Sequence, residues 1–264
     1  MGTRLPLPVA ALLLAGSMAA SAQTNDRYWS AGTALTLPKG RTENGLFQPY
    51  RVGRTDRLEW GTYLLLNLIA PNLQFKLSHG RYGPYSVASR IGFSYPTFLL
   101  RTLQRPGIGG FISPEADVGE IPPILATWAE ILATRVMSDD LLFTARGGIG
   151  WALRGGRMDE RTSIDLPLVY QRMLLYMHGV QLNLGGALAG RLSPGLSWRM
   201  DADLLVTPAA NNSNAFFQKG SIIWDRGKRF RLRLGYILVY GEYPYGSQAH
   251  LLPTVGLEWA GKRS

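Results

Sequence analysis

The sequence predicts an all-β fold: one antiparallel transmembrane β-barrel of about twelve strands that follows a cleaved signal peptide. Three observations predict it. Apolar and polar side chains alternate along most of the chain, and short turns alternate with longer loops between these runs. In addition, no segment after the first 22 residues approaches the ~18 continuous apolar residues of a membrane-spanning helix. An alternation of period two places successive side chains on opposite faces of a strand.

The clearest strand is Arg229 to Tyr240. Its apolar residues fall on one parity: Phe230, Leu232, Leu234, Tyr236, Leu238 and Tyr240. The other parity carries Arg229, Arg231, Arg233 and Gly235, so a strand here has one apolar and one basic face. A helix would spread the arginines around its surface among the leucines. Aromatic residues near both ends are typical of a strand between two interfacial girdles. For this strand alone, a strand of a soluble β-sandwich remains the alternative. Whether the pattern repeats along the chain decides between the sandwich and the membrane barrel.

Residues Met1 to Ala22 are predicted to be a secretory signal peptide, and residues 23–264 a single barrel domain. Arg4 gives the positive start, Val9 to Gly16 is a short apolar run, and Ala20-Ser21-Ala22 is a small-residue cleavage site. A signal peptide predicts export from the cytoplasm, and an exported protein rarely meets nucleic acid, so we expect no nucleic-acid partner.

The remaining strands follow in order, with turn signals between them. Two segments are ambiguous, because Pro123 to Met137 also fits a helix and Arg172 to Leu192 is long enough for two strands. Taking each as one strand gives an even number. The twelve predicted strands are Tyr28 to Leu37, Asn44 to Gly53, Arg57 to Asn67, Asn72 to Gly80, Pro84 to Arg101, Pro123 to Met137, Leu141 to Leu153, Arg172 to Leu192, Leu196 to Thr207, Phe216 to Asp225, Arg229 to Tyr240 and Ala249 to Trp259.

The connections between these strands alternate in length. Tight turns are predicted at Arg54, Arg81, Ser138, Ser193 and Arg226. Between them fall loops at Thr102, Arg154, Pro208 and Gly241 and shorter links at Pro38 and Leu68. Short turns at one end, longer loops at the other and an even strand number are the pattern of outer-membrane barrels. We therefore expect the mature chain in a bacterial outer membrane, with lipid around it; its oligomeric state is left open.

Charge is concentrated on the parity that would face the barrel lumen. The chain has 28 Lys and Arg against 18 Asp and Glu, and no cysteine. The residues predicted to line the lumen and contact solutes are Lys76, Arg90, Arg146, Arg199, Arg231, Arg233, Glu59, Asp201 and Asp203. The same parity also carries Arg57, Glu130, Lys219 and Glu258. Two interpretations stay open: the charges pair across a narrow lumen, or they form a constriction that selects anions.

The residues that hydrolytic or metal chemistry would need are scarce. Histidine occurs only at His79, His178 and His250, and neither His/carboxylate spacing nor cysteine suggests a metal site. The predicted register puts His79 and His178 on the lipid-facing parity. We therefore expect no enzyme activity, no metal and no cofactor. A lipid-modifying hydrolase of the outer membrane is the alternative, because its Ser-His site needs only one histidine at a rim; a structural or adhesive barrel is a third possibility.

A family resemblance rests on three short motifs. They are Thr36-Leu37-Pro38-Lys39-Gly40, Gly45-Leu46-Phe47-Gln48-Pro49 and Gly53-Arg54-Thr55-Asp56-Arg57-Leu58-Glu59. The stretch from residue 36 to residue 77 resembles bacterial outer-membrane barrel proteins and is similar to transporters linked to the meta-pathway of phenol degradation. The resemblance implies a channel or transporter for small polar, anionic or aromatic solutes, and it carries no catalytic residues. Unlike many such barrels, the chain continues for five residues after its last aromatic residue, Trp259.

Overall fold

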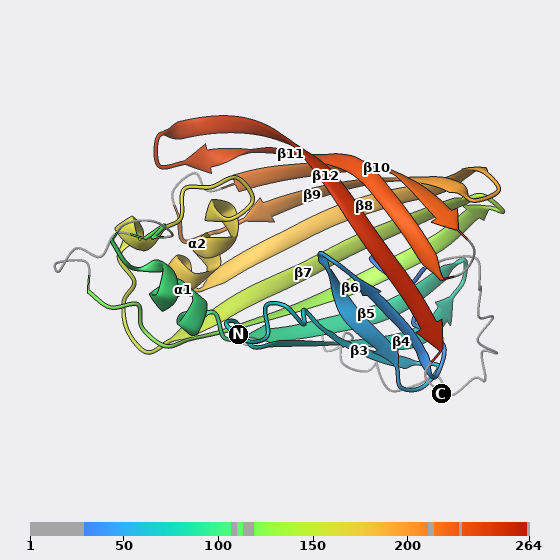
Figure 1. The fold of residues 1–264 in the computed structure, drawn as a ribbon, viewed down its shortest axis with the longest axis horizontal. Coiled ribbons are helices and arrows are strands. Elements are labelled where there is room, and N and C mark those ends of the chain that lie inside the picture. The colour runs from blue at the N-terminus through green and yellow to red at the C-terminus, as the bar shows by residue number, and fades with distance from the viewer. Residues whose placement is uncertain (1–28, 107–109, 113–118, 211–213, 227–228, 263–264) are drawn as a thin grey trace, which may run out of the picture.

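Twelve antiparallel strands close into one barrel (Figure 1). The computed structural model describes residues 29–106, 110–112, 119–210, 214–226 and 229–262, so the predicted signal peptide lies outside the described residues. The strands are β1 Arg41–Gly45, β2 Gln48–Gly53, β3 Leu58–Thr62, β4 Asn72–Tyr82, β5 Tyr85–Ser94, β6 Ile124–Ser138, β7 Leu141–Arg154, β8 Val180–Ser193, β9 Leu196–Val206, β10 Asn214–Arg226, β11 Phe230–Tyr243 and β12 Gly246–Lys262. Each strand pairs with its neighbours in sequence, and β1 pairs with β12. The predicted fold class is confirmed.

The two ends of the barrel differ. At one end, which we call the turn end, short connections join β2 to β3, β4 to β5, β6 to β7, β8 to β9 and β10 to β11. At the other, the loop end, the longer connections carry α1 (Thr97–Leu103), a 3-10 helix (Glu160–Thr162) and α2 (Tyr170–His178) (Figure 1). In outer-membrane barrels the short turns face the periplasm and the long loops face outward.

The outer face of the wall is apolar. Large side chains of the outward parity are strongly exposed, among them Ile131, Leu184 and Leu251 at 62, 64 and 66%. A bilayer requires an apolar outer surface. It also requires a closed barrel, because every backbone group must be paired inside the protein. The helices in the described part of the chain are all too short or too polar to span a membrane. The barrel is thus of the outer-membrane type.

The first predicted strand, Tyr28 to Leu37, is wrong. Its described residues, from Trp29 on, form turns and coil that belong to no strand. The second predicted strand, Asn44 to Gly53, is in fact the hairpin of β1 and β2, which turns at Leu46 and Phe47. Asn44-Gly45, a typical turn dipeptide, ends β1 directly before this turn, and the alternation concealed the signal. The predicted number of twelve holds because these two errors offset each other.

Three predicted strands are longer than the strands of the structure. Arg172 to Leu192 contains α2, which ends at Gly179 in the left-handed conformation (φ 86°), and only then β8. A left-handed glycine is a common end of a helix. Likewise β5 stops before Pro96 and α1 follows it, and β3 stops at Thr62. By contrast, the ambiguous segment from Pro123 to Met137 is a strand, β6, as predicted.

The loop-end connections pack into a small apolar core over the mouth of the barrel. Its buried residues are Leu100, Ile112, Ile121, Ile124, Met158, Ile164, Met173, Leu174 and Met177. The helix α2 contacts β6, β7, β8 and β11, so it lies across the mouth from wall to wall. Gln171 on this helix is 1% exposed and donates from its side-chain amide to the carbonyl oxygen of Glu242 on β11. We call α2 and its flanking residues 155–179 the lid.

Candidate lumen site

The segment from Trp29 to Leu37, which we call the plug, crosses the lumen instead of forming wall. The Arg199 guanidinium on β9 donates to the carbonyl oxygens of Ala31 and Gly32 at 2.9 and 3.3 Å. Three strands away around the barrel, the backbone N–H of Ala34 donates to the Thr134 hydroxyl on β6 at 2.8 Å. The plug is therefore tied to two strands that are not neighbours, and it lies inside the lumen.

The strongest attachment of the plug is a charged cluster on β1 to β4. The Lys76 ammonium lies 3.1 Å from a Glu59 carboxylate oxygen, and it also donates to the carbonyl oxygen of Leu35 at 2.6 Å. The other Glu59 oxygen accepts from the Ser30 hydroxyl and the Leu37 N–H, at 3.1 and 3.0 Å. The Glu59 and Lys76 side chains are only 5 and 3% exposed. Glu59 thus joins the wall to both ends of the plug.

Arg51 and Glu43 extend this cluster to β1 and β2. The Arg51 guanidinium pairs with Glu43, lies 3.6 Å from Glu59 and donates to the Ser30 hydroxyl at 2.7 Å. Glu43 and Arg51 are not among the predicted lumen residues, because the prediction makes Asn44 to Gly53 one strand and leaves Glu43 outside it. The two residues are paired across the β1–β2 hairpin, which the predicted single strand does not contain.

A second cluster joins β7, β8 and β9. Arg146 contacts both Asp203 oxygens at 2.6 and 2.7 Å and an Asp201 oxygen at 3.2 Å. Arg199 makes a two-pronged contact with Asp201, at 2.8 and 2.7 Å. Gly185 makes room for this arrangement, because a Cβ at that position would collide with Asp203 and approach Arg146. These arginines are committed to carboxylates in the geometry that binds them best.

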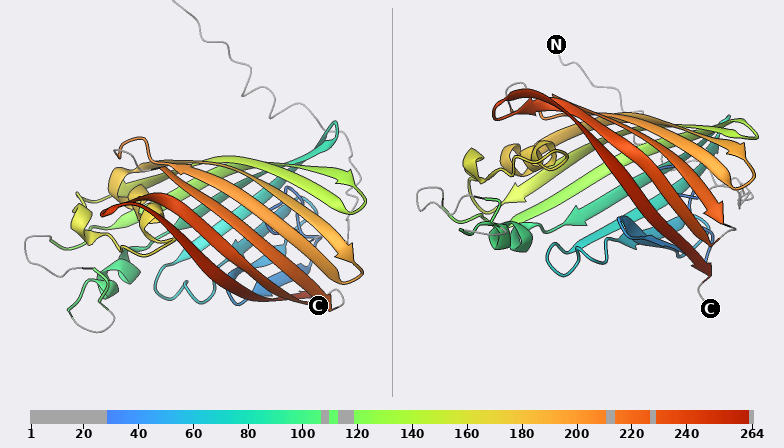
Figure 2. Two further views of the ribbon diagram at one scale, coloured as in Figure 1. Left: turned by 90° about the horizontal axis from the view of Figure 1, so that it is seen from above. Right: turned by 45° about the horizontal axis from the view of Figure 1, so that its top comes forward.

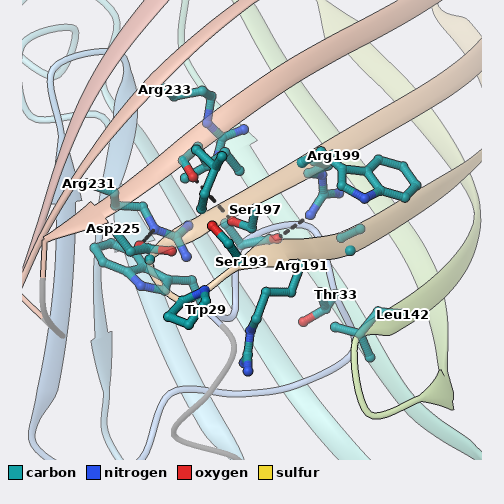
Figure 3. Close-up of a pocket in the computed structure, with 18 residues that line it drawn as sticks. Trp29, Thr33, Leu142, Arg191, Ser193, Ser197, Arg199, Asp225, Arg231 and Arg233 are labelled. Atoms are coloured by element: carbon teal, nitrogen blue, oxygen red, sulfur yellow. Dashed lines mark hydrogen bonds and ion pairs between the residues drawn. The ribbon is translucent and has the colours of Figure 1, made fainter.

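A third cluster lies beside a cavity of about 500 Å³ at the turn end (Figure 3). Arg231 is 3.0 Å from Asp225 and 3.4 Å from Glu258, and Arg233 is 2.9 Å from Glu258. The Arg231 guanidinium carbon lies 3.7 Å from the ring centre of Trp29 in the plug. This stacked contact is a cation–π interaction that ties the first described residue of the plug to β11.

The predicted lumen residues thus fall in separate clusters, not along one stripe. Lys76 and Glu59 lie in the first, Arg146, Arg199, Asp201 and Asp203 in the second, and Arg231 and Arg233 in the third. Arg90 pairs with Glu130 across β5 and β6 and lies over Trp128, 5.0 Å from its ring centre. Arg57, expected on the inward parity, is instead exposed in the turn before β3.

Two basic groups nearer the loop end are less completely neutralised. Lys219 on β10 lies 4.0 Å from Asp203, which Arg146 already engages, and its side chain is 36% exposed. Arg172 on the lid lies over the Phe217 ring, 5.9 Å from its centre. Within the described residues, no carboxylate pairs with Arg172. Both cations thus lie at the inner face of β10.

The histidines are dispersed. His79 on β4 hydrogen-bonds the Ser89 hydroxyl on β5 at 2.9 Å, and Ser89 is paired opposite the outward-facing Leu77. His178 ends the lid helix, so its predicted place on a strand is wrong. His250 on β12 shares the inward parity of Glu258 and lies edge-on to Tyr243. The described residues contain no group of three or more potential metal ligands.

Comparison with known proteins supports the architecture. No protein-family model matches the chain, and no curated protein matches its sequence. Among solved structures, an outer-membrane channel from Pseudomonas putida F1 is similar with a TM-score of 0.51 at 10% identity, over 89% of this chain and 100% of that chain. The KdgM porin in complex with disordered oligogalacturonate matches 83% of this chain and 95% of that chain, with a TM-score of 0.45 at 6% identity. At 10% identity, the likeness to the channel from Pseudomonas putida F1 shows the fold alone, that of an outer-membrane barrel.

Proposed function

We propose that the chain is an outer-membrane channel for small polar, anionic or aromatic solutes. The observation that carries the proposal is the composition of the lumen. Nine basic and seven acidic side chains of the described strands meet there in ion pairs: Arg41, Arg51, Lys76, Arg90, Arg146, Arg199, Lys219, Arg231 and Arg233 against Glu43, Glu59, Glu130, Asp201, Asp203, Asp225 and Glu258. A polar, charged interior inside an apolar wall is what a solute pathway across a membrane needs.

The excess of two positive charges favours anions. Rings of Arg and Lys raise the local concentration of anions and oppose cations. The least neutralised cations, Lys219 and Arg172, both lie at the inner face of β10, so an acidic solute finds positive charge there that carboxylates offset only in part. The resemblance of residues 36–77 to transporters linked to phenol degradation favours the same class of solute.

Reversal potentials in a salt gradient test this proposal. The unmodified channel is expected to prefer anions. The double variant Arg231→Ala, Arg233→Ala removes both excess charges and leaves Glu258 and Asp225 unpaired, so its reversal potential should shift toward cations. The matched control, Arg90→Gln with Glu130→Gln, removes one charge of each sign and should leave the reversal potential unchanged. An unchanged reversal potential in the folded double variant would count against the charge-selective lumen.

A lipid hydrolase remains the second candidate because of one contact, the hydrogen bond between His79 and Ser89 on the lipid-facing side of the barrel. Nucleophilic catalysis by serine needs such a histidine and a further group that orients it. Among the described contacts of His79, no orienting carboxylate occurs. Lipid turnover by the purified protein in micelles, abolished by His79→Ala, would favour the hydrolase over the channel.

A further inference from the structure

The lid carries a cation of its own to the wall of the barrel. Figure 2 shows the lid helix α2, in yellow, at the loop end, where it contacts β7, β8 and β11. The Arg172 guanidinium extends from this helix to β10, where its carbon lies 5.9 Å from the centre of the Phe217 ring. Arg172 is exposed, and no carboxylate within the described part of the chain pairs with it. The lid therefore presents an unpaired guanidinium at the inner face of β10.

The backbone that carries Arg172 is fixed by its neighbours in the lid. Leu168 packs against the buried apolar cluster of β9, β10 and β11. The Gln171 side chain donates to the carbonyl oxygen of Glu242 on β11, and its backbone carbonyl oxygen accepts from the Gln181 side chain on β8 at 2.8 Å. A cation on a fixed backbone binds an anion at a lower entropic cost than one on a loose segment.

Arg172 is unfavourably placed for its own helix. It lies in the first turn of α2, where the helix has no acidic residue and no side-chain cap. The positive end of the helix dipole disfavours a cation in the first turn. Helix stability therefore does not explain an arginine at this position, whereas a bound anion offsets its charge.

Lys219 on β10 supplies a second cation. Lys219 and Phe217 are two residues apart on the strand, so their side chains share its inner face. Among the charged groups of the described residues, Arg172 acts most strongly on the Lys219 ammonium. Asp203 lies 4.0 Å from Lys219, but Arg146 already binds both of its oxygens. Nearby like charges repel each other, and an anion between them replaces this repulsion with attraction.

Positive charge is in excess around this pair of cations. Within the described residues, two carboxylates are the ion-pair partners of three basic side chains of the wall, and Arg172 adds a fourth basic group. The wall residues are Arg146, Arg199 and Lys219, and the carboxylates are Asp201 and Asp203. Two positive charges are thus left for an anion.

We propose that Arg172 and Lys219 form an oxyanion site shared between the lid and the wall, which binds the carboxylate or phosphate group of a small solute. The inference rests on the proposed channel function and names the place where an anionic solute is held. Guanidinium and ammonium groups both bind oxyanions through charge-assisted hydrogen bonds. Because one cation belongs to the lid and the other to the wall, a bound oxyanion joins the two and stabilises the closed lid.

Isothermal titration calorimetry of the purified protein in detergent micelles at low ionic strength tests the site. The probes are benzoate, phenyl phosphate and the neutral benzamide, which share one aromatic ring. The site variants are Arg172→Gln and Lys219→Gln. The matched control is Arg161→Gln, which removes a lid arginine that already pairs with Asp159 at 2.9 Å. Heat-modifiable migration checks that each variant is folded.

Each site variant should weaken the binding of the oxyanions by roughly tenfold or more, because it removes a hydrogen-bond donor that is charged. The control should bind them as the unmodified protein does, and benzamide should bind weakly to all four proteins. A difference in affinity between benzoate and phenyl phosphate then identifies which oxyanion the site prefers.

Hydrogen exchange of the lid amides, residues 155–179, tests the link between the lid and the wall. In the unmodified protein, the tighter oxyanion should slow exchange in the lid. Lys219→Gln leaves the lid itself unchanged and removes a repulsion, so without a probe its lid should exchange no faster than that of the unmodified protein. Addition of the probe should then protect the lid of this variant little. A purely structural lysine predicts the opposite, a lid that exchanges faster in the variant even without a probe.

Equal oxyanion affinity in the unmodified protein and in both site variants would overturn the proposal, as would benzamide binding as tight as that of benzoate. Oxyanion binding that leaves exchange in the lid unchanged would also overturn it, because the site would then not join the lid to the wall. Conductance in planar bilayers judges the channel function separately. A protein that conducts but fails these titrations loses the site alone, whereas a protein that binds oxyanions and does not conduct loses the channel function alone.

Discussion

Glu59→Gln should release the plug. The substitution removes the charge that holds Lys76 and Arg51 and weakens the bonds to Ser30 and Leu37. Because these groups are almost completely buried, breaking the pair costs roughly 3–5 kcal/mol. Part of this free-energy cost applies only while the plug is seated in the lumen, because Lys76 also donates to the plug carbonyl of Leu35. About 3 kcal/mol would lower the ratio of seated to released plug by about 100-fold.

Single-channel recording in planar bilayers is the assay, with urea unfolding measured in parallel. The matched control is Glu130→Gln, whose carboxylate is equally buried at 6% exposure, pairs with Arg90 and has no described bond to the plug. Both variants should lose stability, but only Glu59→Gln should show larger or more frequent openings. If the two variants lose stability alike and conduct alike, the Glu59 cluster holds only the wall, and the reasoning is refuted.

Three further changes are expected to act through single contacts. Gly32→Val should loosen the plug and increase conductance, because Gly32 has φ 68° and a Cβ there would lie 2.5 Å from the Arg199 guanidinium. The strain is of the order of 1–3 kcal/mol. A conductance equal to that of the unmodified channel would contradict this prediction. Phe217→Ala should lower the free energy of unfolding by roughly 3–5 kcal/mol in a denaturant titration, because the ring is 1% exposed and supports Arg172. Gly179→Ala should destabilise the lid by about 1 kcal/mol through its left-handed backbone, seen as faster proteolysis of the loop-end segments without loss of the barrel.

Strand alternation was enough to predict the barrel because lipid on one side and water on the other impose a period of two over most of the wall. β11 illustrates this, since its outward leucines and tyrosines and its inward arginines lie where the pattern puts them. The same alternation misled at Tyr28 to Leu37, because a segment packed inside a lumen also contacts apolar and polar neighbours in turn. Only the three-dimensional contacts of Ser30 and Ala34 distinguish the plug from a strand.

The partners of the lumen charges could not be predicted from parity. Parity says that Arg231 faces inward but not that Asp225, six residues earlier on the neighbouring strand, meets it. Cross-strand pairing depends on the register of each hairpin, and the register depends on turn lengths that carry an uncertainty of one or two residues. The helix in the lid was missed for a different reason, since Met173, Leu174 and Met177 are apolar at helical spacing within a stretch that also alternates.

The junction of β1 with β12 also bears on how the barrel assembles and comes apart. Five residue pairs join these strands, against fourteen between β11 and β12. Closure of the barrel by pairing of β1 with β12 thus forms few backbone hydrogen bonds. It joins residues more than 200 positions apart in the sequence. Backbone amides along this line are expected to exchange with deuterium before those of β6 to β11, because local opening starts where the fewest bonds must break together. The seams of β1 with β2, β2 with β3 and β3 with β4 are shorter still, with three or four residue pairs each, so the line of closure belongs to the part of the wall that is expected to open first.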